Sequence, residues 1–193
     1  LTDPSHLSVE ELLYSATLEE NKSNLIDIYN NVIELHNDWR AYNNIACIFL
    51  LEMDKENAID YLNQAIENGG ANNPDVLNNL GIVASWDGDL VKAEEFFNKA
   101  NASNHNKAIL SIKKGDYRSA SRYYRGQETY NATLATILNG DNNSACTQNT
   151  AQCYYLNAIA GARSGNENRV FTNLEKAINS NSDYKNQAEK DLE

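Results

Sequence analysis

Small side chains recur along this chain at two fixed spacings, first twelve residues and then seven. The recurring positions are Ala46, Ala58 and Ala65; Gly81, Ala93 and Ala100; Ala108 and Ala120, with Gln127 in the third place; and Ala158, Val170 and Ala177. Two antiparallel helices approach to about 8 Å only where their facing side chains are small. The spacing therefore predicts helix hairpins that repeat along the chain.

A second periodic signal marks the ends of the predicted helices. Glycine is followed by a residue suited to capping a helix N-terminus at intervals of 27, 25 and 25, at Gly88-Asp89, Gly115-Asp116, Gly140-Asp141 and Gly165-Asn166. Glycine accepts the left-handed conformation that ends one helix, and Asp or Asn then caps the next. A capping box over Ser8–Glu11 and the triplet Asn73-Pro74-Asp75 mark two further helix starts.

Together these signals predict an all-α fold, an α–α superhelix of hairpins with shortened, degenerate middle repeats and a C-terminal capping helix. The predicted helix pairs are 8–18 with 22–35, 39–52 with 55–68, 74–87 with 89–100, 105–114 with 116–126, 130–139 with 141–147, and 151–164 with 166–179, followed by a last helix over 182–192. We expect one solenoid domain over 1–193, with the best repeats at 39–73 and 74–100. The degenerate repeats are 6–38, 101–126, 127–149 and 151–180.

Two segments carry a recognisable family signature. Trp39-Arg-Ala-Tyr-Asn-Asn-Ile-Ala46 with Ala58-Ile-Asp-Tyr-Leu-Asn-Gln-Ala65 resembles a tetratricopeptide repeat, and so does Val76-Leu-Asn-Asn-Leu-Gly81 with Ala93-Glu-Glu-Phe-Phe-Asn-Lys-Ala100. Glu10-Glu-Leu-Leu-Tyr14 and Asp38-Trp-Arg-Ala-Tyr-Asn-Asn44 are also similar to tetratricopeptide regions of bacterial cell-envelope proteins, some of which carry an outer-membrane-protein-A-like domain. The resemblance implies a scaffold for protein interactions with a periplasmic or outer-membrane-associated address.

The charge and the reactive residues exclude several other classes of function. A formal net charge of −11 repels phosphate backbones, which argues against nucleic-acid binding. The longest apolar candidate, 45–51, is far too short to insert into a membrane. His6, His36 and His105 are not at metal-ligand spacing, and no phosphate loop or nucleophile motif occurs. We therefore expect no enzymatic activity, no cofactor and no metal.

The first helix of each predicted hairpin should line a concave groove. Its candidate residues are Asn43, Asn44, Leu50, Asn78, Asn79, Ile82, Trp86, Tyr155 and Arg163. By resemblance, Asn44 and Asn79 match a place where tetratricopeptide proteins use asparagine to hold a peptide backbone, because an amide both donates and accepts. The alternatives are that these asparagines only cap or solvate helices and that Trp86 packs on the neighbouring hairpin.

Positive charge gathers in one segment of this acidic chain. Six basic residues and one acid lie between Lys107 and Arg125, and the candidate patch is Lys113, Lys114, Arg118, Arg122 and Arg125. The three arginines follow four-and-three spacing, so they should share one helix face. Two interpretations remain open: a solvated outer face, or a dock for an acidic partner or for the acidic flank of another copy.

The three cysteines divide into two groups. Cys47 lies in an apolar stretch, where a buried thiol is the expected state. Cys146 and Cys153 flank a polar linker, and a disulfide between them is possible if the linker is a tight turn; it would indicate an oxidising compartment.

The sequence thus predicts a scaffold that binds a peptide or protein partner in its groove. The alternative is a spacer within a larger envelope protein, with an empty groove. The oligomeric state stays open.

Overall fold

The computed structural model describes residues 3–191, and within that range the regular structure is entirely helical. Twelve α-helices follow one another, with a 3-10 turn at Pro4–His6 and one π-helical turn at Ile66–Gly70. The α-helices are α1 Val9–Thr17, α2 Lys22–His36, α3 Trp39–Leu51, α4 Lys55–Ala65, α5 Pro74–Trp86, α6 Leu90–Lys99, α7 Asn104–Lys113, α8 Tyr117–Tyr123, α9 Tyr130–Leu138, α10 Ala151–Arg163, α11 Glu167–Ser180 and α12 Asp183–Lys190. The all-α prediction is confirmed.

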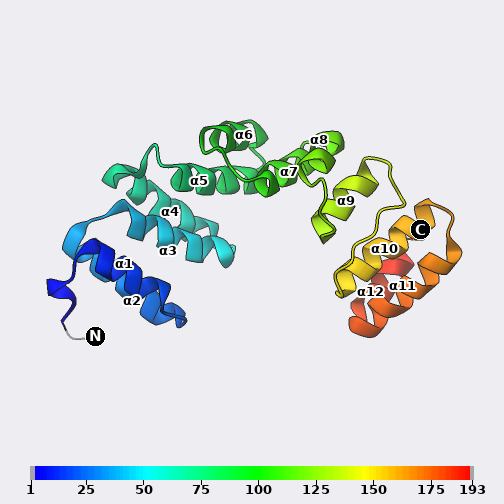
Figure 1. The fold of residues 1–193 in the computed structure, drawn as a ribbon, viewed down its shortest axis with the longest axis horizontal. Helices are drawn as coiled ribbons and strands as arrows, with labels where there is room; N and C mark the ends of the chain where they lie inside the picture. Colours follow the sequence, from blue (N-terminus) through cyan, green and yellow to red (C-terminus); the bar gives the residue numbers. More distant parts are fainter. Residues whose placement is uncertain (1–2, 192–193) are drawn as a thin grey trace. The chain divides into compact units, whose positions relative to one another are not determined.

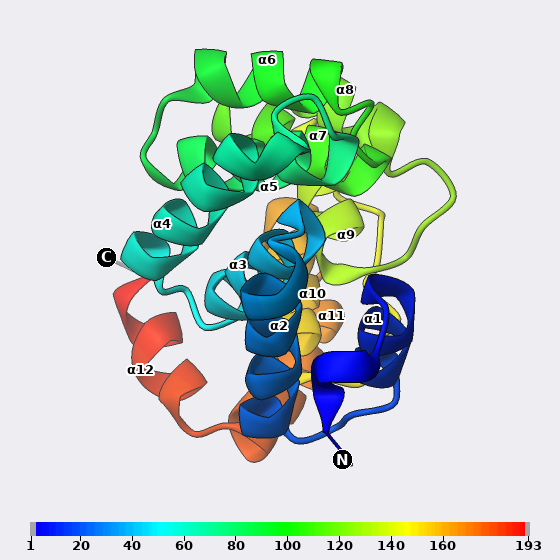
Figure 2. The same ribbon diagram turned by 90° about the vertical axis from the view of Figure 1, so that its left-hand side faces the viewer.

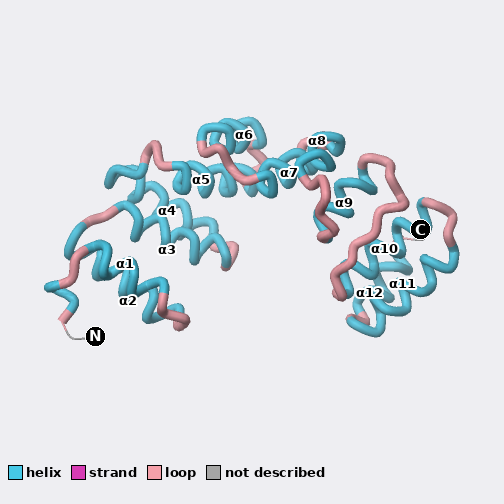
Figure 3. The backbone as a smooth tube through the Cα atoms, viewed as in Figure 1, coloured by secondary structure: helices cyan, strands magenta, loops and turns pink. Residues whose placement is uncertain are grey.

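The chain divides into two compact units, one ending at Ala102 and the other beginning at Ser103. The first unit holds three hairpins, α1–α2, α3–α4 and α5–α6, in which α2 packs on α3 and α4 packs on α5 (Figure 1). The second unit holds the hairpins α7–α8 and α10–α11, with α9 between them in the chain and α12 packed on α11. Short turns join the helices of each hairpin, whereas a longer loop leads from α9 to α10 (Figure 3).

The predicted small residues lie where the helices of a hairpin meet. Ala46 of α3 and Ala58 of α4 are both fully buried, with exposed fractions of 0%. A Cβ added to Gly81 on α5 would come within 2.5 Å of the Phe97 ring on α6. No side chain could therefore stand at Gly81 without displacing that ring, so the spacing inferred from the sequence reflects close helix packing.

Most of the predicted helix boundaries are correct. Gly88 and Gly165 are left-handed, with φ of +79° and +71°. The residues that follow them cap α6 and α11, because their side chains accept the backbone N–H groups of Lys92 and Arg169. The capping box that begins α1 is also present.

The predicted helix over 141–147 is wrong, because this segment is irregular. Asp141 does follow a left-handed glycine, yet its carboxylate accepts the N–H of Asn143, only two residues on, and the Ser144 hydroxyl. Polar residues here bond locally and leave no apolar stripe to bury, so a helix gains little from packing. The loop is instead held by the α10–α11 hairpin: the Asn157 amide bonds both the N–H and the carbonyl of Cys146, and Arg169 donates to two loop carbonyls.

Candidate functional site

The first helices α3 and α5 are joined by a pair of buried amides. Nδ2 of Asn79 donates to Oδ1 of Asn43 at 2.9 Å and lies 3.2 Å from Sγ of Cys47. The two asparagines are only 5% and 7% exposed. A buried amide without a partner is destabilising by about 1–3 kcal/mol, so this pair helps to set the register between the two hairpins.

This pairing corrects the expected exposure of three groove residues. Asn43, Asn79 and Leu50 are buried, although the sequence placed all three on the open side of their helices. The first two face each other because α3 and α5 lie side by side, and the third belongs to the core of the hairpin. A replacement of Asn79 would therefore change stability together with any binding.

A stripe of less buried side chains flanks the amide pair. We define the first-helix surface as Asn44, Cys47 and Leu51 of α3 with Asn78, Ile82 and Trp86 of α5. Leu51 is 87% exposed, and the other five side chains are half-buried. Trp86 and Ile82 are partly buried and pack against the core cluster of these hairpins, which agrees with the packing alternative for the tryptophan.

The polar groups of this surface have specific neighbours. Burial raises the pKa of Tyr29 on α2, and a hydrogen bond with the Asn44 side chain opposes that shift. Burial likewise raises the pKa of the Cys47 thiol, so this cysteine is neutral and weakly nucleophilic at neutral pH. Asn44 therefore joins α3 to α2 in addition to facing the surface.

The cation nearest the start of α3 is already paired. Arg40 Nη1 lies 2.8 Å from Glu10 Oε1, and its Nε lies 2.9 Å from Asp38 Oδ1. The hydrogen bonds from Arg40 lower the pKa of Asp38 below its usual value. A guanidinium held by two carboxylates is a poor receptor for a third, so this end of the surface is not an anion site.

In the second unit, helix α12 covers one predicted groove residue. Tyr155 on α10 is buried, its hydroxyl donates to Asp191 just after α12, and its ring lies 4.8 Å from that of Tyr184. Helix α12 itself follows α11 at the C-terminal end of the described chain (Figure 2). The expectation of an open Tyr155 is therefore wrong, because the capping helix packs over it. Arg163 is exposed at the end of α10.

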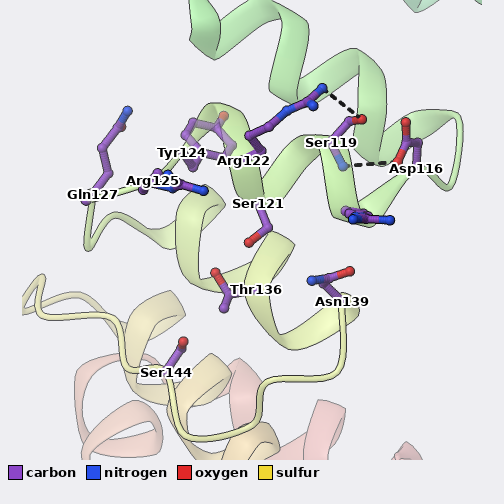
Figure 4. A pocket seen from close by; sticks show the side chains of 12 residues that line it. Asp116, Ser119, Ser121, Arg122, Tyr124, Arg125, Gln127, Thr136, Asn139 and Ser144 are labelled. Atoms are coloured by element: carbon purple, nitrogen blue, oxygen red, sulfur yellow. Dashed lines mark hydrogen bonds between the residues drawn. The ribbon is translucent and has the colours of Figure 1, made fainter.

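The predicted basic patch separates into two parts. Arg118, Arg122 and Arg125 line one polar pocket of about 810 Å³, formed by α8, the turn after it, the end of α9 and the loop at Ser144 (Figure 4). Lys113 and Lys114, at the end of α7, do not line it. Sequence spacing indicated the shared face of the arginines but not the pocket, because the loop from α9 closes its other side.

A disulfide joins Cys146 to Cys153 in the structure, across a Cα separation of 5.4 Å. It ties the loop after α9 to the first turn of α10. Cys47 is the remaining cysteine, and it is free.

Reduction of this disulfide is expected to lower the free energy of unfolding by about 2 kcal/mol, because the cross-link restricts the unfolded chain. Urea denaturation of the oxidised protein and of the Cys146→Ser, Cys153→Ser double variant measures the difference. Thiol titration of the oxidised, denatured protein should give one free thiol; three free thiols would show that the bond does not form.

Residues 3–191 contain no cluster of three or more His, Cys, Asp or Glu side chains placed to hold a metal ion. Within the same range, no helix has the length and apolar character needed to cross a bilayer.

Comparison with known proteins identifies one repeat at the level of sequence. Residues 40–68, which cover most of the α3–α4 hairpin, match the model of the tetratricopeptide repeat family. No curated protein sequence matches the chain.

Solved structures share the fold over nearly the whole chain. PilW, described as a widely conserved type IV pilus biogenesis factor, is 15% identical, with a TM-score of 0.75 and full coverage of both chains. PilF of Pseudomonas aeruginosa is 14% identical, with a TM-score of 0.66 and coverage of 94% of this chain and 95% of that one. YrrB, a tetratricopeptide protein with an unusual peptide-binding site, is 17% identical, with a TM-score of 0.57 and coverage of 84% and 97%. The chain thus contains a tetratricopeptide repeat and has the fold of tetratricopeptide proteins.

Proposed function

We propose that this chain is a scaffold that holds an extended peptide segment of a partner protein against the first-helix surface. The observation that carries the proposal is the Asn79–Asn43 hydrogen bond, which sets α3 and α5 side by side so that their partly exposed stripes adjoin. Ile82, Trp86 and Leu51 supply apolar contacts to this surface, and Asn44 and Asn78 supply amides. The peptide-binding description of YrrB, a protein of similar fold, agrees with this role.

The chemistry of the cysteine on this surface and the net charge of the chain favour the binding of a protein over catalysis. The pKa of the Cys47 thiol is raised, which is the opposite of what a nucleophilic cysteine needs. The acidic net charge favours a protein partner over a nucleic acid.

We further propose an envelope address for the protein. The resemblance of its first repeats to tetratricopeptide regions of envelope proteins supports that address, as does the likeness in fold to a pilus biogenesis factor. The Cys146–Cys153 disulfide agrees with an oxidising compartment.

Leu51→Asp is expected to weaken peptide binding at least about tenfold, because it places a desolvated charge in an apolar contact. Peptides are first selected against the chain from a random displayed library, and their affinities are then measured by fluorescence anisotropy. Val91→Asp is the matched control, because Val91 is 78% exposed on the second helix α6 and Leu51 is 87% exposed on a first helix.

The control variant should bind as tightly as the unaltered chain. Equal losses of affinity in both variants would contradict the groove and favour the spacer alternative. Selected peptides whose affinity is unchanged by Leu51→Asp would do the same.

A further inference from the structure

The pocket in the second unit contains a concentration of unneutralised positive charge. Three of its twelve lining residues are arginines, and Asp116 is its single acid. Among residues 3–191, no carboxylate lies within ion-pair distance of Arg118, Arg122 or Arg125. In contrast, Lys22, Arg40, Lys55 and Lys99 each pair with a carboxylate.

Asp116, the acidic residue of the pocket, is hydrogen-bonded to the first turn of α8. The Asp116 carboxylate caps α8 by accepting the N–H of Ser119 at 3.0 Å. The hydrogen bonds from Ser119, and then the charges of Arg122 and Lys114, lower the pKa of Asp116. Figure 4 shows Asp116 at one end of the pocket, beside Ser119 and away from Arg125 and Gln127. Arg125 lies at the other end, whereas the Arg122 guanidinium reaches toward Ser119 and donates to its hydroxyl at 3.5 Å. A neutral hydroxyl does not compensate the charge of Arg122, so both arginines keep their capacity for an outside anion.

The remaining lining indicates what kind of anion fits. Ser121, Thr136, Asn139 and Gln127 bring hydroxyls and amides to the pocket, and these groups can accept hydrogen bonds as well as donate them. A peptide backbone needs both donors and acceptors, whereas a bare phosphate uses donors alone. The volume of about 810 Å³ is within the range of pockets that enclose a ligand.

We infer that this pocket binds a short acidic peptide segment, with Arg118, Arg122 and Arg125 holding its carboxylates. The planar guanidinium matches a carboxylate with two parallel hydrogen bonds. A short segment is required because the chain carries a net charge of −11, and its acidic surface repels further acidic residues of a long polyanion that lie within the screening length of about 8 Å at physiological salt. The pocket is built from the second helix α8, the end of α9 and the loop after it, so it shares no residue with the first-helix surface and does not depend on the proposed groove.

The test uses a fluorescent peptide of six glutamates and its six-glutamine counterpart, with binding to the whole chain followed by anisotropy. The glutamate peptide should bind, and the glutamine peptide should not. The Arg118→Gln, Arg122→Gln double variant should bind the glutamate peptide at least about tenfold more weakly, because two charge-assisted contacts are lost. Lysine at both positions should restore part of the affinity, because it restores the positive charge but not the two parallel hydrogen bonds of a guanidinium.

Lys185→Gln, Lys190→Gln is the matched control, because it removes the same charge from exposed positions on α12. All variants should keep the helical circular-dichroism spectrum of the unaltered chain, since every replaced side chain is exposed. An equal loss in the α12 variant would overturn the assignment by showing a general charge effect. So would displacement of the peptide by inorganic phosphate at constant ionic strength, or an arginine-dependent dimer that excludes the peptide.

Discussion

Replacing Leu62 by alanine is expected to lower the free energy of unfolding of the first unit by about 2–5 kcal/mol. Leu62 on α4 is completely buried, and it packs in one cluster with Tyr42 and Leu50 of α3 and with Val76 and Val83 of α5. The truncation removes contacts to two hairpins at once. Because the neighbouring side chains are held by their own helices, they cannot fill the cavity fully.

Urea denaturation followed by circular dichroism measures this loss. Asn63→Ala is the control, because Asn63 is the next residue of the same helix and is exposed. The control should change stability by no more than about 0.5 kcal/mol. A similar small change for Leu62→Ala would mean that the cluster does not hold the two hairpins together.

Gly81→Leu is expected to destabilise the first unit by about 3 kcal/mol, through overpacking between α5 and α6. The first added carbon alone would lie 2.5 Å from the Phe97 ring, and Phe97 is only 3% exposed. Glycine inside a helix is unfavourable by about 0.5–1 kcal/mol relative to alanine, so its presence at this position is explained by the space that the ring occupies.

The contact can be isolated by a double-mutant cycle with Phe97→Ala. Each single variant should lose unfolding free energy. The loss in the double variant should be smaller than the sum of the two single losses, because the leucine occupies space vacated by the ring. Losses that simply add would show that Gly81 and Phe97 do not meet.

Much of the fold was predictable because it depends on local chemistry and on a regular spacing. Gly88 and Asp89 end one helix and cap the next through their own conformational preferences, wherever the helices go. Ala46 and Ala58 identify a hairpin because close packing admits only small side chains there. These signals need no knowledge of distant contacts.

The errors arose where distant contacts decide the outcome. The loop over 141–147 begins at the same glycine–aspartate pair as the true helix starts. It is irregular because side chains of α10 and α11 hydrogen-bond its backbone. The burial of Asn43 and Asn79 depends on how far α3 and α5 rotate toward each other, which spacing along one helix does not reveal. Tyr155 is covered by a helix that lies some thirty residues later in the chain.

The candidate sites were predictable in part for the same reason. The four-and-three spacing of Arg118, Arg122 and Arg125 is local, so the sequence indicated their common face. The pocket itself was not predictable, because its other wall is formed by residues of α9 and the loop after it, namely Thr136, Asn139 and Ser144.

Mapping a bound peptide by NMR identifies the helices that form its binding surface. Backbone amide shifts of the labelled chain are recorded while a library-selected peptide is added. Binding at the first-helix surface predicts that the large changes fall on α3 and α5, around Asn44, Leu51, Asn78 and Ile82. Changes concentrated on the second helices α4 and α6 would contradict it.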